Sequence, residues 1–395
     1  MTSHDPNRLP TTPTRDVAMV AERSRAAGEI GLDTEFMRER TYRARLCLVQ
    51  LATPDEIFIL DPLEVEDLSP LADVVADPSV EVVVHAGRQD FEIFFERYGA
   101  IPTRVFDVQL AAAFAGLGAS LPYGRLVHDV TGSKLKKGES YTDWCRRPLT
   151  SEQFVYAADD VRYLLEVARE LKRRLDEQGR GEWVTEELRS LETAEAFETD
   201  LDEVYKRVGG RGSLTGKQLA VLRAVARWRE SEAQRRDTPR GWIVKDPTLI
   251  EIARKAPTTI AALTGIRGLN PREAERFGPA ILEVIRSGLE GEEIKTPKAA
   301  PRSTQVRARV LSGPSDAIVR SRCEAANLAT ELVATRGELE ALLTDVSAGV
   351  TDLSRHRLMQ GWRRELAGDY VVAFAEGRVA LHATPGPPYI EEVAQ

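Results

Sequence analysis

The amino-acid sequence predicts a mixed α/β domain followed by all-α domains. Three strand-like segments, 29–36, 44–51 and 56–60, follow one another over short connections, which favours an antiparallel meander. A run rich in β-branched residues at 80–85 predicts a further, buried strand. In the second half apolar residues recur at helical spacing, and strand-like sequence returns at 370–374. The 395 residues are enough for two or three such domains.

The helices of the first half follow from apolar spacing and capping residues. Residues 88–98 are expected to pack through Phe91, Phe94 and Phe95. A long helix is predicted over 152–175, where apolar residues recur at helical spacing and Thr150 can cap the first turn. The other elements expected here are helices at 16–27, 68–76 and 126–131, an Ala-rich helix ending at Phe114, a short strand at 105–107 and a polar, mobile loop at 132–143.

The second half predicts two helical units. A helix at 217–235 ends at the turn-forming residues 238–241, and short helices at 248–255, 258–263 and 271–287 complete the first unit. The second unit, 316–366, is expected to start at Ser315 and to break at Gly349. The predicted organisation is a disordered leader at 1–12, an α/β domain at 13–205, a helical domain at 207–290, a Lys/Pro/Ala-rich linker at 291–312 and a second, degenerate helical domain at 313–385.

Composition predicts neither a membrane span nor a secretory signal. No apolar run reaches the length of about 18 residues that a spanning helix needs, and the N-terminus is polar. Cys47, Cys145 and Cys323 form no C-x-x-C pair, so we expect neither a disulfide framework nor a zinc site, and we expect a reducing cytoplasm.

Charge is distributed unevenly along the chain. The net charge of −8 argues mildly against a nucleic-acid partner. Two segments are nevertheless basic: residues 210–255 hold eleven Lys/Arg against five Asp/Glu, and 295–322 hold seven against one. These segments are compatible with an anionic substrate, although basic helices are often only solvated faces.

Acidic residues in three separate segments are candidates for a metal site. Asp33 and Glu35 lie two apart on a predicted strand and therefore face the same side. Asp90 lies at the start of a helix, and Tyr156 and Asp160 lie four apart on one helix face. Adjacent carboxylates repel unless a cation lies between them, although each of these could also be a solvated surface group.

These residues resemble a known family. The sequences DTEF at 33–36, HAGRQD at 85–90 and YAADD at 156–160 are similar to the three exonuclease motifs of the DEDD superfamily, tyrosine subclass. The similarity to bacterial ribonuclease D extends to 57–63, 106–114 and 138–150. Residues 207–290 resemble the HRDC module, and 313–380 resemble a weaker second copy. The resemblance implies a ribonuclease H-like fold with its first predicted strand near the sheet centre.

The resemblance also implies roles for the acidic residues. Asp33, Glu35, Asp90 and Asp160 would bind two divalent ions, Mg²⁺ or Mn²⁺, with Asp33 bridging both, and Tyr156 would orient the attacking water. Asp160 is preferred over its neighbour Asp159 because only Asp160 has the motif's spacing from Tyr156. Asp107 matches a further acidic position and is expected at most to support the site. His85, a single histidine at a strand end, is assigned no chemistry.

Candidate substrate-binding residues are less specific. A first group precedes the tyrosine helix and could contact phosphates or stack on a base, or be only surface loop: Lys136, Lys137, Tyr141 and Trp144. A second group lies in the first helical unit: Arg223, Arg227, Arg235, Arg236 and Lys245 for phosphates, with exposed Trp242 as a stacking platform. The second unit has an acidic helix at 331–345, a poor surface for phosphate, and we expect it to pack against the α/β domain.

The sequence thus predicts a cytoplasmic, monomeric 3′–5′ exoribonuclease that releases nucleoside 5′-monophosphates and needs no obligate protein partner. The resemblance implies tRNA precursors with a short unpaired 3′ tail as its RNA. A 3′–5′ DNA exonuclease stays open, because no residue here shows whether a 2′-hydroxyl is read. A catalytically inactive nucleic-acid-binding protein is the third alternative, and the presence of all five motif residues disfavours it.

Overall fold

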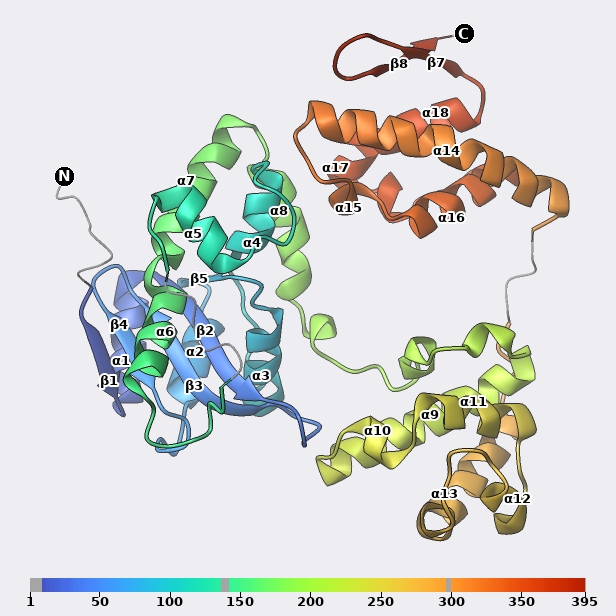
Figure 1. Cartoon of the computed structure of the whole chain (residues 1–395), viewed down its shortest axis with the longest axis horizontal. Coiled ribbons are helices and arrows are strands. Elements are labelled where there is room, and N and C mark those ends of the chain that lie inside the picture. The colour runs from blue at the N-terminus through green and yellow to red at the C-terminus, as the bar shows by residue number, and fades with distance from the viewer. Residues whose placement is uncertain (1–8, 136–141, 296–299, 395) are drawn as a thin grey trace.

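A six-stranded mixed sheet forms the centre of the first domain (Figure 1). The computed structural model describes residues 9–135, 142–295 and 300–394. The strands are β1 (Thr11–Thr14), β2 (Glu29–Met37), β3 (Arg45–Ala52), β4 (Ile57–Leu60), β5 (Glu81–Val84) and β6 (Val105–Asp107), in the order β1-β4-β3-β2-β5-β6. The predicted meander is confirmed, since β2, β3 and β4 pair antiparallel, while β5 and β6 continue the sheet in parallel. β1 was not predicted, and it occupies residues 11 and 12 of the expected leader.

Strand β2 lies in the middle of the sheet, as the resemblance implied. It pairs with β3 on one side and β5 on the other, and Ile30 and Leu32 are fully buried. A Cβ on Gly31 would lie 3.2 Å from the Cβ of Leu164, so a helix packs directly on the bare backbone there. This central position fixes the strand end from which Asp33 and Glu35 project.

Eight helices surround the sheet in the described part of this domain. They are α1 (Val17–Ala27), α2 (Ser69–Val75), α3 (Arg88–Tyr98), α4 (Val108–Phe114), α5 (Tyr123–Thr131), α6 (Ser151–Arg162), α7 (Leu164–Glu177) and α8 (Gly181–Leu188). Thr150 caps α6 as predicted, and Gln153 completes a capping box. The single helix expected over 152–175 is wrong: the chain bends at Tyr163. The bend lets α6 pack on β3 and β4 while α7 crosses β2 and β5 (Figure 1).

The cysteine prediction was also wrong. Cys47 on β3 and Cys145, in the segment before α6, form a disulfide with their Cα atoms 5.1 Å apart. Cys323 is buried as a free thiol. The partners are 98 residues apart in sequence, so only the folded chain brings them together.

The second domain is a helical unit with its own core. Its helices are α9 (Gly216–Arg236), α10 (Arg240–Ile243), α11 (Asp246–Lys255), α12 (Ile260–Thr264) and α13 (Pro271–Glu290). Helix α9 packs along α13 and α11, burying Leu222 and Val225. The chain between the first two domains forms short 3₁₀ turns at Arg189–Leu191, Ala194–Ala196, Val204–Arg207 and Arg211–Ser213.

The third domain differs from its prediction at both ends. Its main helices are α14 (Arg302–Ala325), α15 (Thr330–Val333), α16 (Arg336–Ser347), α17 (Gly361–Arg363) and α18 (Asp369–Ala375), with a 3₁₀ turn at Arg357–Met359 and a π-helical turn at Arg364–Gly368. Helix α14 starts well before Ser315 and continues through Pro314, so the expected linker is shorter than 291–312. Residues 370–374 are helical, not a strand, and the strands are a later hairpin, β7 (Val379–Ala383) and β8 (Ile390–Ala394).

The third domain packs against the first, as expected from its acidic helix. Trp362 is 2% exposed, stacks on Trp183 of α8 at 5.2 Å between ring centroids, and meets Phe114 of α4 edge-on at 5.0 Å. The indole N–H of Trp362 donates to Glu187, which also pairs with Arg363. One continuous apolar core therefore includes both domains, whereas α9 to α13 enclose a separate one.

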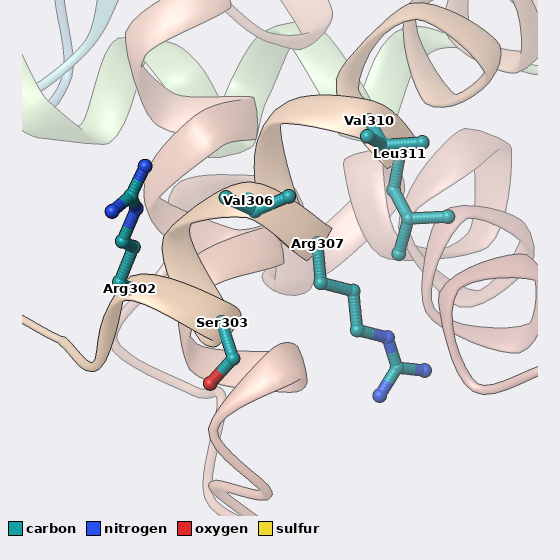
Figure 2. A pocket seen from close by; sticks show the side chains of 6 residues that line it. All are labelled: Arg302, Ser303, Val306, Arg307, Val310 and Leu311. Carbon is teal, nitrogen blue, oxygen red and sulfur yellow. The ribbon is translucent and has the colours of Figure 1, made fainter.

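A pocket of about 580 Å³ lies on the first turns of α14 (Figure 2). Its lining residues are Arg302, Ser303, Val306, Arg307, Val310 and Leu311. None of them is a carboxylate or a histidine, so this pocket offers no metal ligand set. Acidic groups that could hold an ion lie elsewhere, on the sheet of the first domain.

Candidate active site

Three carboxylates converge at the end of β2. Asp33 and Glu35 project from the strand, and Asp160 reaches them from α6, which packs on β2. One oxygen from each side chain lies within 4.8 Å of the others. The two-residue spacing on the strand and the helix crossing over it therefore bring together residues that are separated by more than a hundred positions in sequence.

This grouping is electrostatically unfavourable without a cation. Burial raises the pKa of Asp33 well above its usual range, and the charges of Asp160 and Asp90 raise it further. Burial and the same kind of repulsion raise the pKa of Glu35 to about 9. Burial, then Glu35, also raise the pKa of Asp160. Half-buried carboxylates with no cation among them favour the protonated form, and a divalent ion reverses that preference.

Asp90 lies beside this group and is held differently. It is 7% exposed in the first turn of α3, and one of its carboxylate oxygens accepts a hydrogen bond from the hydroxyl of Thr34. Burial raises the pKa of Asp90 to about 7. Sequence reasoning missed Thr34, because strand alternation predicts that its side chain faces away from Asp33 and Glu35. It connects the strand to the fourth acidic residue.

Asp107 supports the turn that precedes Asp90. Its carboxylate accepts hydrogen bonds from the backbone N–H groups of Ala86 and Gly87, at 3.1 and 3.2 Å, and caps α4 through the N–H of Gln109. The nearby His85 ring contacts the carbonyl of Leu121 at 2.9 Å, and burial lowers its pKa. Both side chains thus hold loops in place.

The adjacent acids Asp159 and Asp160 point to different partners. Asp159 accepts from the guanidinium of Arg162 at 2.8 Å and forms an ion pair with it. Asp160 belongs to the carboxylate group. Tyr156, one turn earlier on α6, is half-buried, and its ring centroid lies 5.9 Å from that of Trp144.

Of the candidate substrate-binding residues before α6, Trp144 lies in the described part of the chain. Lys136, Lys137 and Tyr141 lie outside the described residues. Trp144 is 2% exposed, so the expectation that it stacks on a base from the surface was wrong. It packs inside the first domain instead.

The candidates in the second domain are spread along α9 and the segment after it. Trp242 is 62% exposed and Lys245 is exposed. The remaining members are Arg223, which is half-buried, Arg227, which pairs with Asp202, and Arg235 and Arg236, which both pair with Glu232. The ion pairs compensate part of their positive charge.

The second domain touches the β2–β3 hairpin whose base carries the carboxylates. The Tyr42 hydroxyl donates to Glu230 at 2.7 Å and accepts from Gln234 at 3.2 Å. The backbone N–H of Arg43 donates to Asp237 at 2.9 Å. The C-terminal end of α9 is therefore hydrogen-bonded to the tip of this hairpin.

The donor set fits a hard divalent cation. Asp33, Glu35 and Asp160 offer only carboxylate oxygens, which Mg²⁺ and Mn²⁺ prefer, and the described site contains no cysteine or histidine ligand in this group. Among the helices of the described chain, none combines the length and the apolar character required to cross a bilayer.

Comparison with known proteins agrees with this site. Residues 10–176 match the family model for a 3′-5′ exonuclease, and residues 218–285 match the HRDC domain. The chain is 38% identical over 383 residues to ribonuclease D of Gluconacetobacter diazotrophicus, with 95% of each chain covered. It is 37% identical over 388 residues to ribonuclease D of Granulibacter bethesdensis, covering 96% of this chain and 95% of that one.

A solved structure shows the same likeness over almost the whole chain. RNase D of Escherichia coli, an exoribonuclease involved in structured RNA processing, aligns with a TM-score of 0.79 and 28% identity. The alignment covers 93% of this chain and 99% of the other. The chain therefore belongs to the ribonuclease D family and is a hydrolytic 3′–5′ exoribonuclease, with an HRDC domain after its exonuclease domain.

Proposed function

We propose that this exoribonuclease trims the 3′ tails of structured RNA, tRNA precursors in particular, with two divalent ions, Mg²⁺ or Mn²⁺. The observation that carries the metal assignment is the convergence of Asp33, Glu35 and Asp160 within 4.8 Å. Asp90 is the fourth proposed ligand, since it contributes to the raised pKa of both β2 carboxyls. Two ions bound here would activate a water and stabilise charge on the leaving 3′ oxygen.

Tyr156 is proposed to orient the attacking water. It lies one turn before Asp160 on α6, so its hydroxyl and that carboxylate extend from the same helix face. A phenol hydroxyl can donate a hydrogen bond to a water or accept one from it, so Tyr156 can act without being a metal ligand. The chemistry then divides between the carboxylates, which bind metal, and Tyr156, which fixes the direction of attack.

The second domain is proposed to hold the body of the RNA. Its hydrogen bonds to Tyr42 and Arg43 hold the C-terminal end of α9 at the tip of the β2–β3 hairpin. Arg223, Arg227, Arg235, Arg236 and Lys245 would contact phosphates, and Trp242 would stack on a base. The protein is proposed to act as a monomer in the cytoplasm, where Cys47 and Cys145 would meet reducing conditions.

The metal and substrate assignments are tested together by end-labelled RNA and DNA of matching sequence, with Mg²⁺, with Mn²⁺ and with EDTA. Stepwise shortening of the RNA 3′ end, absent with EDTA, is expected. Asp160→Asn should lower kcat by about 100-fold or more, because charge stabilisation by a bound metal is worth several kcal/mol. Asp159→Asn is the matched control, and it should remain within about 3-fold of the native enzyme. Equal losses in the two variants would overturn the ligand assignment, and preferential shortening of DNA would favour the DNA exonuclease.

The RNA-binding surface has its own test. Trp242→Ala and Lys245→Ala should raise the Kd for a structured RNA by about 3- to 10-fold while leaving the Kd of a short single strand unchanged. Both side chains are exposed, so the melting temperature should not move. Unchanged binding of both RNAs would leave these residues as an ordinary solvated surface.

A further inference from the structure

A short segment before α6 contacts the proposed water-orienting tyrosine from inside the domain. Residues 142–148, here called the tryptophan strap, place Trp144 against Tyr156 with the ring centroids 5.9 Å apart and the planes tilted by 38°. That separation lies in the range in which aromatic rings attract each other. Trp144 is 2% exposed, whereas Tyr156 is half-buried, so one ring is enclosed and the other is partly open to solvent.

The strap is fastened to the sheet at its C-terminal end. The guanidinium of Arg147 donates to Asp61 at 2.7 Å, to the carbonyl of Cys47 at 2.7 Å and to the carbonyl of Trp144 at 2.8 Å. Cys145 is also bonded covalently to Cys47 on β3. The residues that follow Trp144, Cys145 and Arg147, are thus both bonded to the sheet, and these bonds restrict the movement of Trp144.

The N-terminal end of the strap is tied to the helix that carries Tyr156. The side-chain amide of Gln153 donates to the hydroxyl of Thr142 at 3.1 Å, and its carbonyl oxygen accepts from the backbone N–H of Thr150. Gln153 thus belongs both to the capping box of α6 and to the strap. The position of Trp144 is set relative to α6 itself, one turn from the tyrosine.

The chemistry proposed for Tyr156 depends on where its hydroxyl lies. A group that directs a water must be within about 2.6–3.2 Å of it, and a misplacement of about 1 Å can lower the rate by about 100-fold. A tyrosine ring on a helix can occupy more than one rotamer unless a neighbour excludes the others. Trp144 is held in place beside the Tyr156 ring, so it can exclude the other rotamers of that ring.

We propose that Trp144 is a positioning residue for catalysis: its ring, fixed by the Arg147–Asp61 pair and the Gln153–Thr142 hydrogen bond, holds Tyr156 in the rotamer that orients the attacking water. The inference rests on the role of Tyr156 proposed above. This positioning role differs from that of an ordinary core tryptophan, which stabilises the fold without affecting the rate of the chemical step. It also gives a role inside the domain to a tryptophan that is too enclosed to stack on RNA.

The test compares kcat and KM on a labelled RNA with Mg²⁺ for the full-length protein and for Trp144→Ala, Trp144→Phe, Tyr156→Phe and the Trp144→Ala/Tyr156→Phe double variant. Trp183→Ala is the matched control, since Trp183 is a tryptophan of α8 that stacks on Trp362 of the third domain and does not belong to the carboxylate group. Melting temperatures are measured for all variants. If Trp144→Ala does not fold, Trp144→Leu, which keeps apolar volume without a ring, takes its place.

Trp144→Ala should lower kcat by about 10- to 100-fold with KM within about 2-fold, and Trp144→Phe should recover most of the loss. In the Tyr156→Phe background the same change should alter kcat by less than about 2-fold, because the tyrosine hydroxyl through which Trp144 acts is gone. Trp183→Ala should lower the melting temperature without lowering kcat.

Three results would overturn the inference. Losses that multiply in the double variant would mean that the two rings act independently. Full activity in Trp144→Ala, with reduced activity in Tyr156→Phe, would remove the role of Trp144 and leave that of Tyr156 intact. Full activity in Tyr156→Phe would contradict the roles proposed for both Tyr156 and Trp144. The metal assignment would be unaffected, because Asp160→Asn tests it separately.

Discussion

Without metal, the protein should become less stable as the pH rises from about 6 to about 9, and Glu35→Gln should remove part of that loss. Folding raises the pKa of the Glu35 carboxyl from its ordinary value of 4.5 to about 9 through burial and the charges of Asp33 and Asp90. Between these two values the folded protein keeps a proton that the unfolded chain has released. The free energy of unfolding therefore falls as the pH rises through this window.

The magnitude follows from that difference in proton binding. One proton held only by the folded state changes the free energy of unfolding by at most about 1.4 kcal/mol for each pH unit. Over about three pH units the upper bound is roughly 4 kcal/mol. Because Glu35 is only half-buried and water screens it, we expect about 1 to 2 kcal/mol. A glutamine cannot ionise and does not contribute this loss.

The assay is denaturant unfolding in EDTA at both pH values, followed by tryptophan fluorescence. Glu198→Gln, at an exposed glutamate, is the control and should lose as much stability as the native protein. Adding Mg²⁺ should restore stability at high pH in the native protein and restore less in Glu35→Gln, which has one ligand charge fewer. Equal pH-dependent losses in the native protein and in Glu35→Gln would refute the reasoning.

Three further perturbations test the fold around the site. Trp362→Ala should lower the free energy of unfolding by about 3–5 kcal/mol, because this 2% exposed side chain packs on the first domain. The control Trp242→Ala, at a side chain that is 62% exposed, should change that free energy by no more than about 0.5 kcal/mol. Equal losses of the two variants in urea titrations would contradict this. Tyr42→Phe removes the hydroxyl that donates to Glu230 at 2.7 Å, so the contact between the β2–β3 hairpin and α9 should weaken by about 1 kcal/mol. Limited proteolysis between the two domains should then become faster. An unchanged cleavage rate would count against the contact. Gly31→Val should cost about 1–3 kcal/mol, since even a Cβ would lie 3.2 Å from the first residue of α7; an unaltered melting temperature would show that the helix can shift.

The sequence was sufficient for the parts of the molecule that local spacing controls. The alternation around Asp33 and Glu35 predicted the strand and the common direction of the two carboxylates, and the structure has both. The four-residue spacing of Tyr156 and Asp160 predicted a shared helix face. Asp160, not Asp159, joins the carboxylates, as that spacing favoured, and Asp159 has Arg162 for a partner.

The sequence failed where tertiary packing decides. The β-branched residues of 370–374 favour a strand in isolation, but Val371 and Val372 are buried in a helix packed on α14 and α16. The Cys47–Cys145 bond depends on two segments that meet only in the folded domain. The hydrogen bond from the Thr34 hydroxyl to Asp90 likewise joins two elements that meet only in the folded domain, so the residues around Thr34 do not predict it.

The shared core of the first and third domains has a consequence for how the chain is made. Trp362 completes a cluster begun by Phe114 and Trp183, so this side of the exonuclease domain stays open to water until α17 has left the ribosome. The HRDC helices, which enclose their own core, can fold earlier and independently. Chains that stall between the two helical domains would expose an apolar face and attract chaperones or proteases, so synthesis itself delays completion of the nuclease until nearly the whole polypeptide is present.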